Sequence, residues 1–153
     1  RERRVAFCSA LAATADATLV AGRGHQLSEK ATTPFVISKD LESLVAKHEG
    51  ESLTRRAQKL FASLGLDAEL ARGAARKVRA GKGKRRGRRY RRPKSVLVVL
   101  SEFNGAERAF RNLAGVDVTT AAQLNTEMLA PGGDPGRLMV ISQPALKALE
   151  ARL

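Results

Sequence analysis

A cluster of basic side chains is the feature of this sequence whose chemistry is most readily stated. Positions 72–94 contain no Asp or Glu. The same stretch contains thirteen basic residues, which are Arg72, Arg76, Lys77, Arg79, Lys82, Lys84, Arg85, Arg86, Arg88, Arg89, Arg91, Arg92 and Lys94. The chain has 28 basic and 15 acidic residues in all, so this stretch alone accounts for its net charge of +13. Such a concentration of charge indicates a polyanionic partner.

The composition of the stretch favours nucleic acid binding over a merely solvated charged segment. Nine of the thirteen residues are Arg, whose guanidinium binds phosphate through two hydrogen bonds and stacks on bases. Tyr90, the only tyrosine of the chain, lies among them, where its ring could stack on a base or a ribose. The stretch also leads directly into an apolar run that begins at Ser95, so its far end is anchored.

RNA is the expected nucleic acid. No helix-turn-helix or zinc-finger pattern is evident, and an irregular loop punctuated by glycine can adapt to the shape of a folded RNA. A membrane surface is disfavoured because no apolar side chains alternate with the charges. The glycines at 81, 83 and 87 do not have the spacing of a phosphate-binding loop, nor do they lie between a strand and a helix.

Other chemistry finds little support in the sequence. Cys8, His25 and His48 are too few and too scattered for a metal site. Cys8 is expected on the apolar face of the first helix as a small core residue, and His25 in a loop with a surface or phosphate-facing role. Asp40 and Glu42 fit the start of a helix, where the helix dipole favours negative charge. We therefore predict no enzymatic activity, cofactor, metal or small-molecule substrate.

Two alternatives remain open at this stage. One is an α/β enzyme whose basic loop attracts a substrate, which would need polar groups at the carboxyl ends of its strands. The candidates for those positions are Ser38, Ser101, Glu102, Thr119 and Ser142. The other alternative is a general RNA chaperone or regulator that binds RNA without selecting a site.

The hydrophobic pattern supplies the elements that would position these residues. Helices are expected over 1–21, 39–50, 52–65, 104–115 and 145–153, a further turn or two over 67–78, and a short helix or turn at 120–124. Asn104 and Glu107 have the spacing of a capping box. Strands are expected over 34–38, 95–101, 116–120 and 137–142, and a Pro/Gly-rich loop over 125–136.

Strands that alternate with helices indicate an α/β fold. We predict three layers, in which helices cover both faces of a mostly parallel sheet of about four strands, with the basic segment as a long loop insertion. The 153 residues are expected to form one domain, in which 72–94 is an Arg/Gly-rich RNA-binding loop. With 43% hydrophobic but only 4% aromatic residues, the core must consist of Ala, Leu and Val. One cysteine fits a reducing compartment, and neither a membrane span nor a secretory signal is visible.

Several segments resemble a known family. "ALAATADATLVAGRGH", "KVRAGKGKRRGRRYRRPKSVLVV", "RNLAGVDVTTAAQLNTEMLAPGG" and "GRLMVISQPALKALE" are similar, in this order, to the archaeal and eukaryotic branch of the universal fourth protein of the large ribosomal subunit. The resemblance implies an α/β domain on the ribosome exterior that binds large-subunit rRNA, mainly its 5′ domain, during assembly. It also implies neighbouring ribosomal proteins as partners and a cytoplasmic location.

The resemblance and the charge pattern together give a set of RNA-binding residues. Arg111 and Asn112 match a family motif at a helix end, and Arg23 and His25 match a loop near RNA. The full set is Arg76, Lys77, Arg79, Lys82, Lys84, Arg85, Arg86, Arg88, Arg89, Tyr90, Arg91, Arg92, Lys94, Arg23, His25, Arg111 and Asn112. Family members carry a preceding region with a long loop that reaches the nascent-peptide tunnel, and this region is expected to be missing from the sequence here.

Overall fold

The computed structural model describes residues 1–28, 31–38, 41–42 and 52–153. The helix expected over 39–50 lies outside the described residues except for positions 41 and 42, and so do Asp40 and His48. No helix in the described part of the chain is long and apolar enough to cross a membrane.

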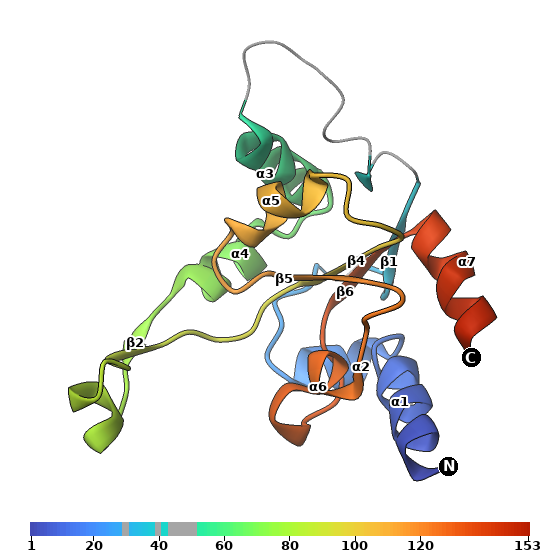
Figure 1. The fold of residues 1–153 in the computed structure, drawn as a ribbon. Coiled ribbons are helices and arrows are strands. Elements are labelled where there is room, and N and C mark those ends of the chain that lie inside the picture. Colours follow the sequence, from blue (N-terminus) through green and yellow to red (C-terminus); the bar gives the residue numbers. More distant parts are fainter. Residues whose placement is uncertain (29–30, 39–40, 43–51) are drawn as a thin grey trace.

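A four-stranded parallel sheet forms the centre of the molecule (Figure 1). Its strands are β1 (Phe35–Ile37), β4 (Leu97–Leu100), β5 (Asp117–Thr120) and β6 (Met139–Ser142), in the order β1-β6-β4-β5. Leu97 of β4 is in register with Met139 of β6 on one side and with Asp117 of β5 on the other. The α/β fold and the number of strands predicted from the sequence are confirmed.

Helices cover both faces of the sheet, which explains why β4 and β6 are buried along their whole length. On one face, Val98 and Val140 pack with α3 (Leu53–Ser63), α4 (Asp67–Ala74) and α5 (Ala106–Arg111). Phe61 and Phe110 meet there edge to face, with their ring centroids 5.6 Å apart. On the other face, Leu97 and Ile141 pack with α1 (Glu2–Ala13), α6 (Thr126–Leu129) and α7 (Gln143–Arg152).

The single helix predicted over 1–21 is wrong, because α1 ends at Ala13 and α2 (Ala17–Gly22) follows as a separate helix. Asp16 begins α2 by accepting a hydrogen bond from the amide of Thr18, at 2.8 Å. The face of α1 that packs inward also differs from the prediction. Ala10 and Ala13 are buried on it, whereas Cys8 is exposed and is not the small core residue expected from the sequence.

Two further helix starts depart from the prediction. The segment 125–136, expected as a loop, contains α6 and the short 3-10 helix η4 (Pro131–Gly133). The side chain of Asn125 begins α6 by accepting from the amide of Met128, at 2.9 Å. The predicted capping pair is displaced by one residue, since the N-cap of α5 is Gly105, whose amide donates to Glu107 at 2.8 Å.

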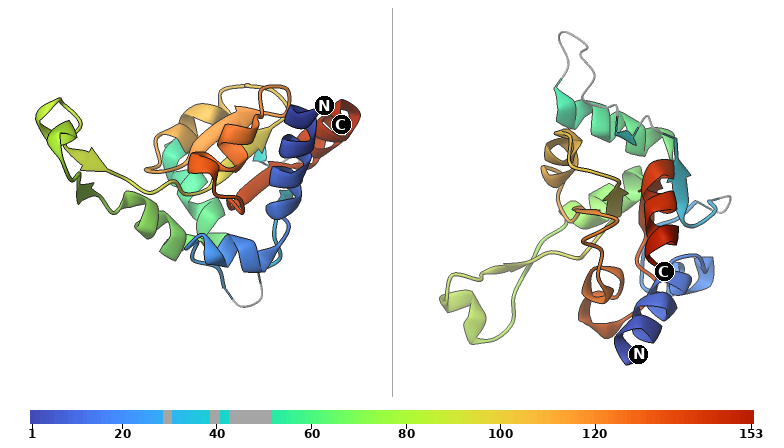
Figure 2. Two further views of the ribbon diagram at one scale, coloured as in Figure 1. Left: turned by 90° about the horizontal axis from the view of Figure 1, so that it is seen from below. Right: turned by 45° about the vertical axis from the view of Figure 1, so that its right-hand side comes forward.

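The basic segment forms a projecting hairpin instead of the irregular loop predicted from the sequence (Figures 1 and 2). Its two antiparallel strands are β2 (Lys77–Val78) and β3 (Tyr90–Arg91), joined through the 3-10 helix η3 (Lys82–Arg85). The further helical turn or two expected over 67–78 is present as α4, which ends at Ala74. We refer to residues 76–92 as the basic arm.

Candidate nucleic-acid interface

The basic arm has no hydrophobic core of its own, and none of its residues belongs to the two hydrophobic clusters of the sheet. Every residue of the arm except Gly83 is exposed. Eleven of its residues are basic and none is acidic, and these are Arg76, Lys77, Arg79, Lys82, Lys84, Arg85, Arg86, Arg88, Arg89, Arg91 and Arg92. Within the described residues, none of the eleven forms an ion pair with a carboxylate. Their mutual repulsion is therefore uncompensated inside the molecule.

Backbone hydrogen bonds give the arm its shape. Val78 is in register with Tyr90, and the amide of Arg79 donates to the carbonyl of Arg89 at 2.8 Å. At the tip, Gly81 and Gly87 have φ angles of 74° and 76° and flank η3. A residue with a Cβ atom is disfavoured at such angles, so these two glycines permit the turn.

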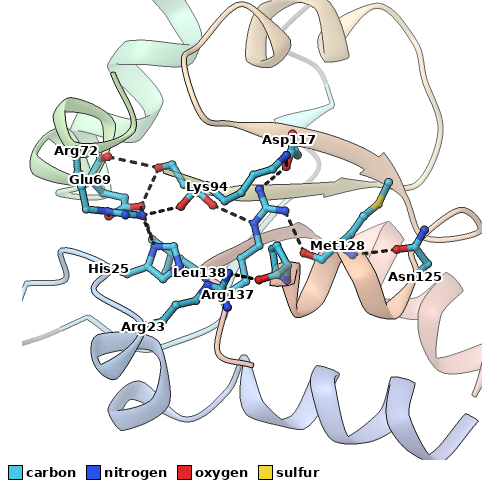
Figure 3. A network of polar contacts seen from close by, with 12 residues as sticks. Arg23, His25, Glu69, Arg72, Lys94, Asp117, Asn125, Met128, Arg137 and Leu138 are labelled. Carbon is cyan, nitrogen blue, oxygen red and sulfur yellow. Dashed lines mark hydrogen bonds and ion pairs between the residues drawn. The ribbon is translucent and has the colours of Figure 1, made fainter. Parts of the chain in front are cut away.

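A buried carboxylate holds both ends of the arm (Figure 3). Glu69 of α4 is fully buried and accepts hydrogen bonds from Nε and Nη2 of Arg72, at 2.8 and 2.7 Å. It also accepts from the hydroxyl of Ser95, at 2.8 Å, just after the arm ends. Nη2 of Arg72 donates in addition to the carbonyl of Lys94 at 2.7 Å. The entry and the exit of the arm are thus joined through one side chain.

The hydrogen bonds to Glu69 keep it ionised. Burial alone would raise the pKa of this carboxyl, but the hydrogen bonds from Arg72, His25, the amide of Gln26 and Ser95 outweigh it and lower the pKa to about 2. Conversely, the hydrogen bond to Glu69 raises the pKa of Arg72. The root of the arm therefore contains a buried ion pair with additional hydrogen-bond donors.

Gly73 lets the helix before the arm approach the strand after it. A Cβ atom at this position would lie 2.7 Å from the carbonyl oxygen of Ala114 and 2.9 Å from Cβ of Ser95, closer than real Cβ atoms come. The glycine that is unfavourable for a helix by propensity is thus required by packing at the root of the arm. The close approach brings Ser95 within hydrogen-bonding distance of Glu69.

The expected surface or RNA-facing role of His25 is wrong. Its side chain is 1% exposed, and its Nδ1 lies 2.8 Å from Oε1 of Glu69. Nε2 accepts a hydrogen bond from the amide of Leu138 at 3.2 Å, so Nδ1 carries the proton in the neutral ring. Arg23, the other residue expected in this loop, donates to the carbonyls of Pro131, at 2.8 Å, and of Asp134. The guanidinium of Arg23 therefore forms hydrogen bonds within the protein, to the loop at 131–134.

A second ionic cluster lies between the end of the arm and the edge of the sheet (Figure 3). Asp117 accepts from Nζ of Lys94 at 2.7 Å and from Nη2 of Arg137 at 2.6 Å. Burial would raise the pKa of Asp117, but these two cations lower it below its usual value. Arg137 is 1% exposed and also donates to the carbonyls of Ser95 and Met128, each at 3.0 Å. Lys94 is half exposed, so its ammonium also faces solvent.

The structure brings Lys94 and Arg111 to one hollow of about 770 Å³, beside the root of the arm. The guanidinium carbon of Arg111 lies 5.3 Å from the ring centroid of Phe103. Asn112 is also exposed, but its amide donates to the hydroxyl of Thr54 of α3, at 3.2 Å. Of the predicted residues outside the arm, Lys94 and Arg111 thus present cationic groups to a common surface.

The carboxyl ends of the strands, where an α/β enzyme would bind its substrate, are occupied by the carboxylate of Glu42. It accepts from the amide and hydroxyl of Ser101, at 2.8 and 2.9 Å, and from the hydroxyl of Ser142, at 2.6 Å. Thr119 is buried and donates to the carbonyl of Thr120. Within residues 1–28, 31–38, 41–42 and 52–153, no three His, Cys, Asp or Glu side chains gather as a metal site would require.

Glu69 and Arg137 are the important residues that the sequence analysis did not identify. Glu69 lies three positions before Arg72, a spacing at which helical side chains meet, so a local signal existed. Arg137 lies two positions before the fully buried strand β6, and a buried charge at that position must find partners inside the protein. Its partners are distant in sequence, however, and only the structure identifies them.

Comparisons with known proteins agree on one family. The profile described as "Ribosomal protein L4/L1 family" matches residues 1–152. A protein of Methanopyrus kandleri named large ribosomal subunit protein uL4 is 47% identical over 154 residues, which cover 100% of this chain and 56% of that relative. The protein of the same name from Haloarcula marismortui is 47% identical over 152 residues, covering 99% of this chain and 58% of the relative. The chain thus spans less than three-fifths of the length of these curated relatives.

Proposed function

The chain belongs to the ribosomal protein L4/L1 family, and from this membership we propose that it is a structural protein of the large ribosomal subunit that binds rRNA. The family resemblance predicted from the sequence is confirmed. The proposal includes the 5′ domain of large-subunit rRNA as the binding partner, neighbouring ribosomal proteins as further contacts, and a cytoplasmic location. No catalytic step is part of it.

The observation that carries the proposal is the exposed basic arm. Its eleven basic residues lack carboxylate partners among the described residues, whereas the sheet and its helices pack around two hydrophobic clusters. A polyanion that surrounds the arm would remove this repulsion and release its own counterions. The arm extends away from the sheet and its helices (Figure 2), so RNA can reach it from several sides.

The proposed contact surface consists of the arm and the adjoining hollow. The arm supplies its eleven basic residues and Tyr90, and the hollow supplies Lys94 and Arg111. Asn112 is kept as a contact because it is exposed beside Arg111. His25 is excluded because it is buried, and Arg23 is assigned to holding the loop at Pro131.

The family assignment disfavours a general RNA chaperone, which would bind any RNA equally. A ribosomal protein instead requires a shaped RNA site, and a hairpin held at its root can supply the matching shape. The enzyme alternative is disfavoured on separate grounds, because Glu42 occupies the carboxyl ends of β4 and β6.

The test is a binding measurement with a transcript of the 5′ domain of large-subunit rRNA, compared with a scrambled RNA of equal length across a salt series. Replacing Arg88→Glu together with Arg91→Glu should weaken binding roughly 40-fold at 0.1 M salt. Each phosphate contact contributes about 0.7–0.9 to the slope of log affinity against log salt, so at 0.1 M, one decade below 1 M, the loss of two contacts lowers log affinity by about 1.6. The matched control is Arg4→Glu with Lys147→Glu, which makes the same change of charge at exposed positions of α1 and α7.

The control pair should bind nearly as well as the unmodified chain, and circular dichroism should show that both variants fold. Equal weakening by the two pairs would contradict the proposal, since binding would then depend on net charge and not on the arm. Equal affinity for the two RNAs at every salt concentration would support the general chaperone instead.

A further inference from the structure

The arm exposes two apolar side chains next to each other. Val78 and Tyr90 are directly opposite in the β2–β3 ladder, so both side chains lie on the same face of the hairpin. They are 59% and 41% exposed. Neither contributes to the hydrophobic core. An apolar pair in the middle of a highly charged arm is unnecessary for binding phosphate alone.

Cations hold the ring of Tyr90 in place. The guanidinium carbon of Arg76 lies 4.3 Å from the ring centroid, and that of Arg89 lies 5.6 Å from it. At these distances a guanidinium is attracted to the face of an aromatic ring. Arg76 directly precedes β2 and lies two positions before Val78. We refer to the ring of Tyr90, with the guanidinium of Arg76 over it, as the platform.

A hollow of about 640 Å³ opens beside this platform. It is lined by Tyr90, Gly87 and five arginines, among them Arg76, Arg88 and Arg92, and by no acidic residue. Its volume lies within the range of about 300–1,000 Å³ that small-molecule sites have. Gly87 adds no side chain to the wall, and its positive φ is part of the turn that shapes it.

The chemistry of this lining matches an unpaired nucleotide better than a duplex. In a duplex each base is stacked between its neighbours, so only phosphates and groove edges could meet the arm. An unpaired base offers a flat face that stacks on Tyr or on an Arg guanidinium. The phosphates on either side of it would then meet the surrounding arginines, which bind them through two hydrogen bonds each.

We propose that this hollow binds one unpaired RNA nucleotide, with its base stacked against Tyr90 and its flanking phosphates bound by Arg88 and Arg92. The inference rests on the proposed RNA-binding function and makes it more specific. It assigns the arm a class of RNA partner, a loop or bulge with at least one free base, and it gives Tyr90 a role that the arginines cannot replace.

The sequence provides a direct probe, because Tyr90 is the only tyrosine. In a chain labelled with ¹³C-tyrosine, the ring gives a single set of resonances. These should move upfield on addition of a single-stranded RNA of about ten nucleotides, because the ring current of a stacked base shields them. They should not move upfield with an abasic oligonucleotide of the same length or with a blunt RNA duplex carrying as many phosphates.

Substitution supplies the second readout, measured by fluorescence anisotropy with the same labelled single strand. Tyr90→Ala should lower the affinity about 5- to 150-fold, the range found when a stacking aromatic is removed, without changing the slope of log affinity against log salt. Tyr90→Phe should keep the affinity, because the ring and not the hydroxyl makes the contact. As the matched control, Arg85→Ala at the tip should lower the slope by about 0.7–0.9 and leave the tyrosine shifts unchanged.

The outcomes separate this inference from the proposed function. If no RNA binds at low salt, the RNA-binding function itself is overturned. If RNA binds but the abasic strand shifts the ring as strongly, or Tyr90→Ala binds as tightly as the unmodified chain, the nucleotide site is overturned while RNA binding stands. Equal losses in Tyr90→Phe and Tyr90→Ala would assign the contact to the hydroxyl and overturn the stacking.

Discussion

At the scale of single residues, the interior of the protein contains the buried charged side chains of Glu69 and Arg137, close to the ends of the exposed arm. Glu69 is fully buried yet ionised, because Arg72, His25, Ser95 and the amide of Gln26 all donate to it. A buried carboxylate without such donors would take up a proton. Two of these donors, Arg72 and Ser95, flank the arm, so the same hydrogen bonds that keep Glu69 ionised also hold the two ends of the arm together.

The lowered pKa of Glu69 predicts how stability depends on pH. The pKa is about 2 in the folded chain, against an ordinary 4.5 in the unfolded one. Its ionisation therefore stabilises the fold fully above about pH 4.5, and this contribution, up to about 3 kcal/mol, is lost as the pH falls from 4.5 towards 2. Denaturant unfolding at several pH values should show that Glu69→Gln costs about 3 kcal/mol at pH 7 and flattens the loss below pH 4.5.

Glu150→Gln is a suitable control, since Glu150 is exposed on α7. It should leave both the stability and its pH profile unchanged. If Glu69→Gln kept the full pH dependence of the unmodified chain, the acid loss would have to come from other carboxyls, of which Asp117 also has a lowered pKa.

At the scale of elements, the arm is structurally separate from the sheet and its covering helices, which we call the body. The arm adds no residue to either hydrophobic cluster, and its ends are joined through Arg72 and the carbonyl of Lys94. We therefore expect the body to fold without the arm. The reverse does not hold, because a two-stranded hairpin alone is at best marginally stable in water.

Deleting the arm tests this separation. Replacing residues 76–92 by a short Gly/Ser linker should leave the melting temperature of the body unchanged or slightly higher, since eleven mutually repelling charges are removed. Binding to the rRNA transcript should fall to the level of non-specific contacts. Thermal melting followed by circular dichroism, with the arm-containing chain as reference, measures the first effect. A body that unfolds without the arm would contradict the separation.

The elements also show how far the sequence could lead. The run 95–101 was correctly assigned as a buried strand because a continuous apolar run has few other uses. The hairpin could not be predicted because its strands, β2 and β3, have two residues each, too few to show a periodic pattern. Their pairing also depends on the shape of the long turn between them, which the local sequence does not specify. Among the site residues, the arginines were visible by charge, whereas Glu69 depends on partners such as Ser95, 26 positions away.

At the scale of the whole molecule, the charge is strongly segregated. Outside 72–94 the chain carries fifteen basic and fifteen acidic residues, so the body is nearly neutral while the hairpin is densely positive. Such a molecule turns in the field of a polyanion, and the hairpin approaches first. The position of the charge should therefore matter for the rate of encounter, beyond its total amount.

This segregation predicts a difference in association rate between two variants of equal net charge. Arg88→Glu with Arg91→Glu should slow association with the rRNA transcript severalfold more than Arg4→Glu with Lys147→Glu, and the difference should shrink as salt rises from about 0.05 to 0.5 M. Stopped-flow mixing with labelled RNA measures both rates. Identical rates at low salt would show that only the net charge directs the encounter.

Because the arm is attached only at its root, a small rotation there moves its tip by a larger distance. With about six residues on each side of η3, at roughly 3.3 Å per extended residue, the arm reaches on the order of 20 Å from the body. A rotation of about ten degrees at the root would displace the tip by about 3–4 Å, as much as the length of a hydrogen bond. The position of Lys82 and Arg85 at the tip therefore depends on the hydrogen bonds that Arg72 and Ser95 donate to Glu69 at the root. A buried side chain outside the proposed RNA-binding surface would thus determine how precisely that surface is positioned.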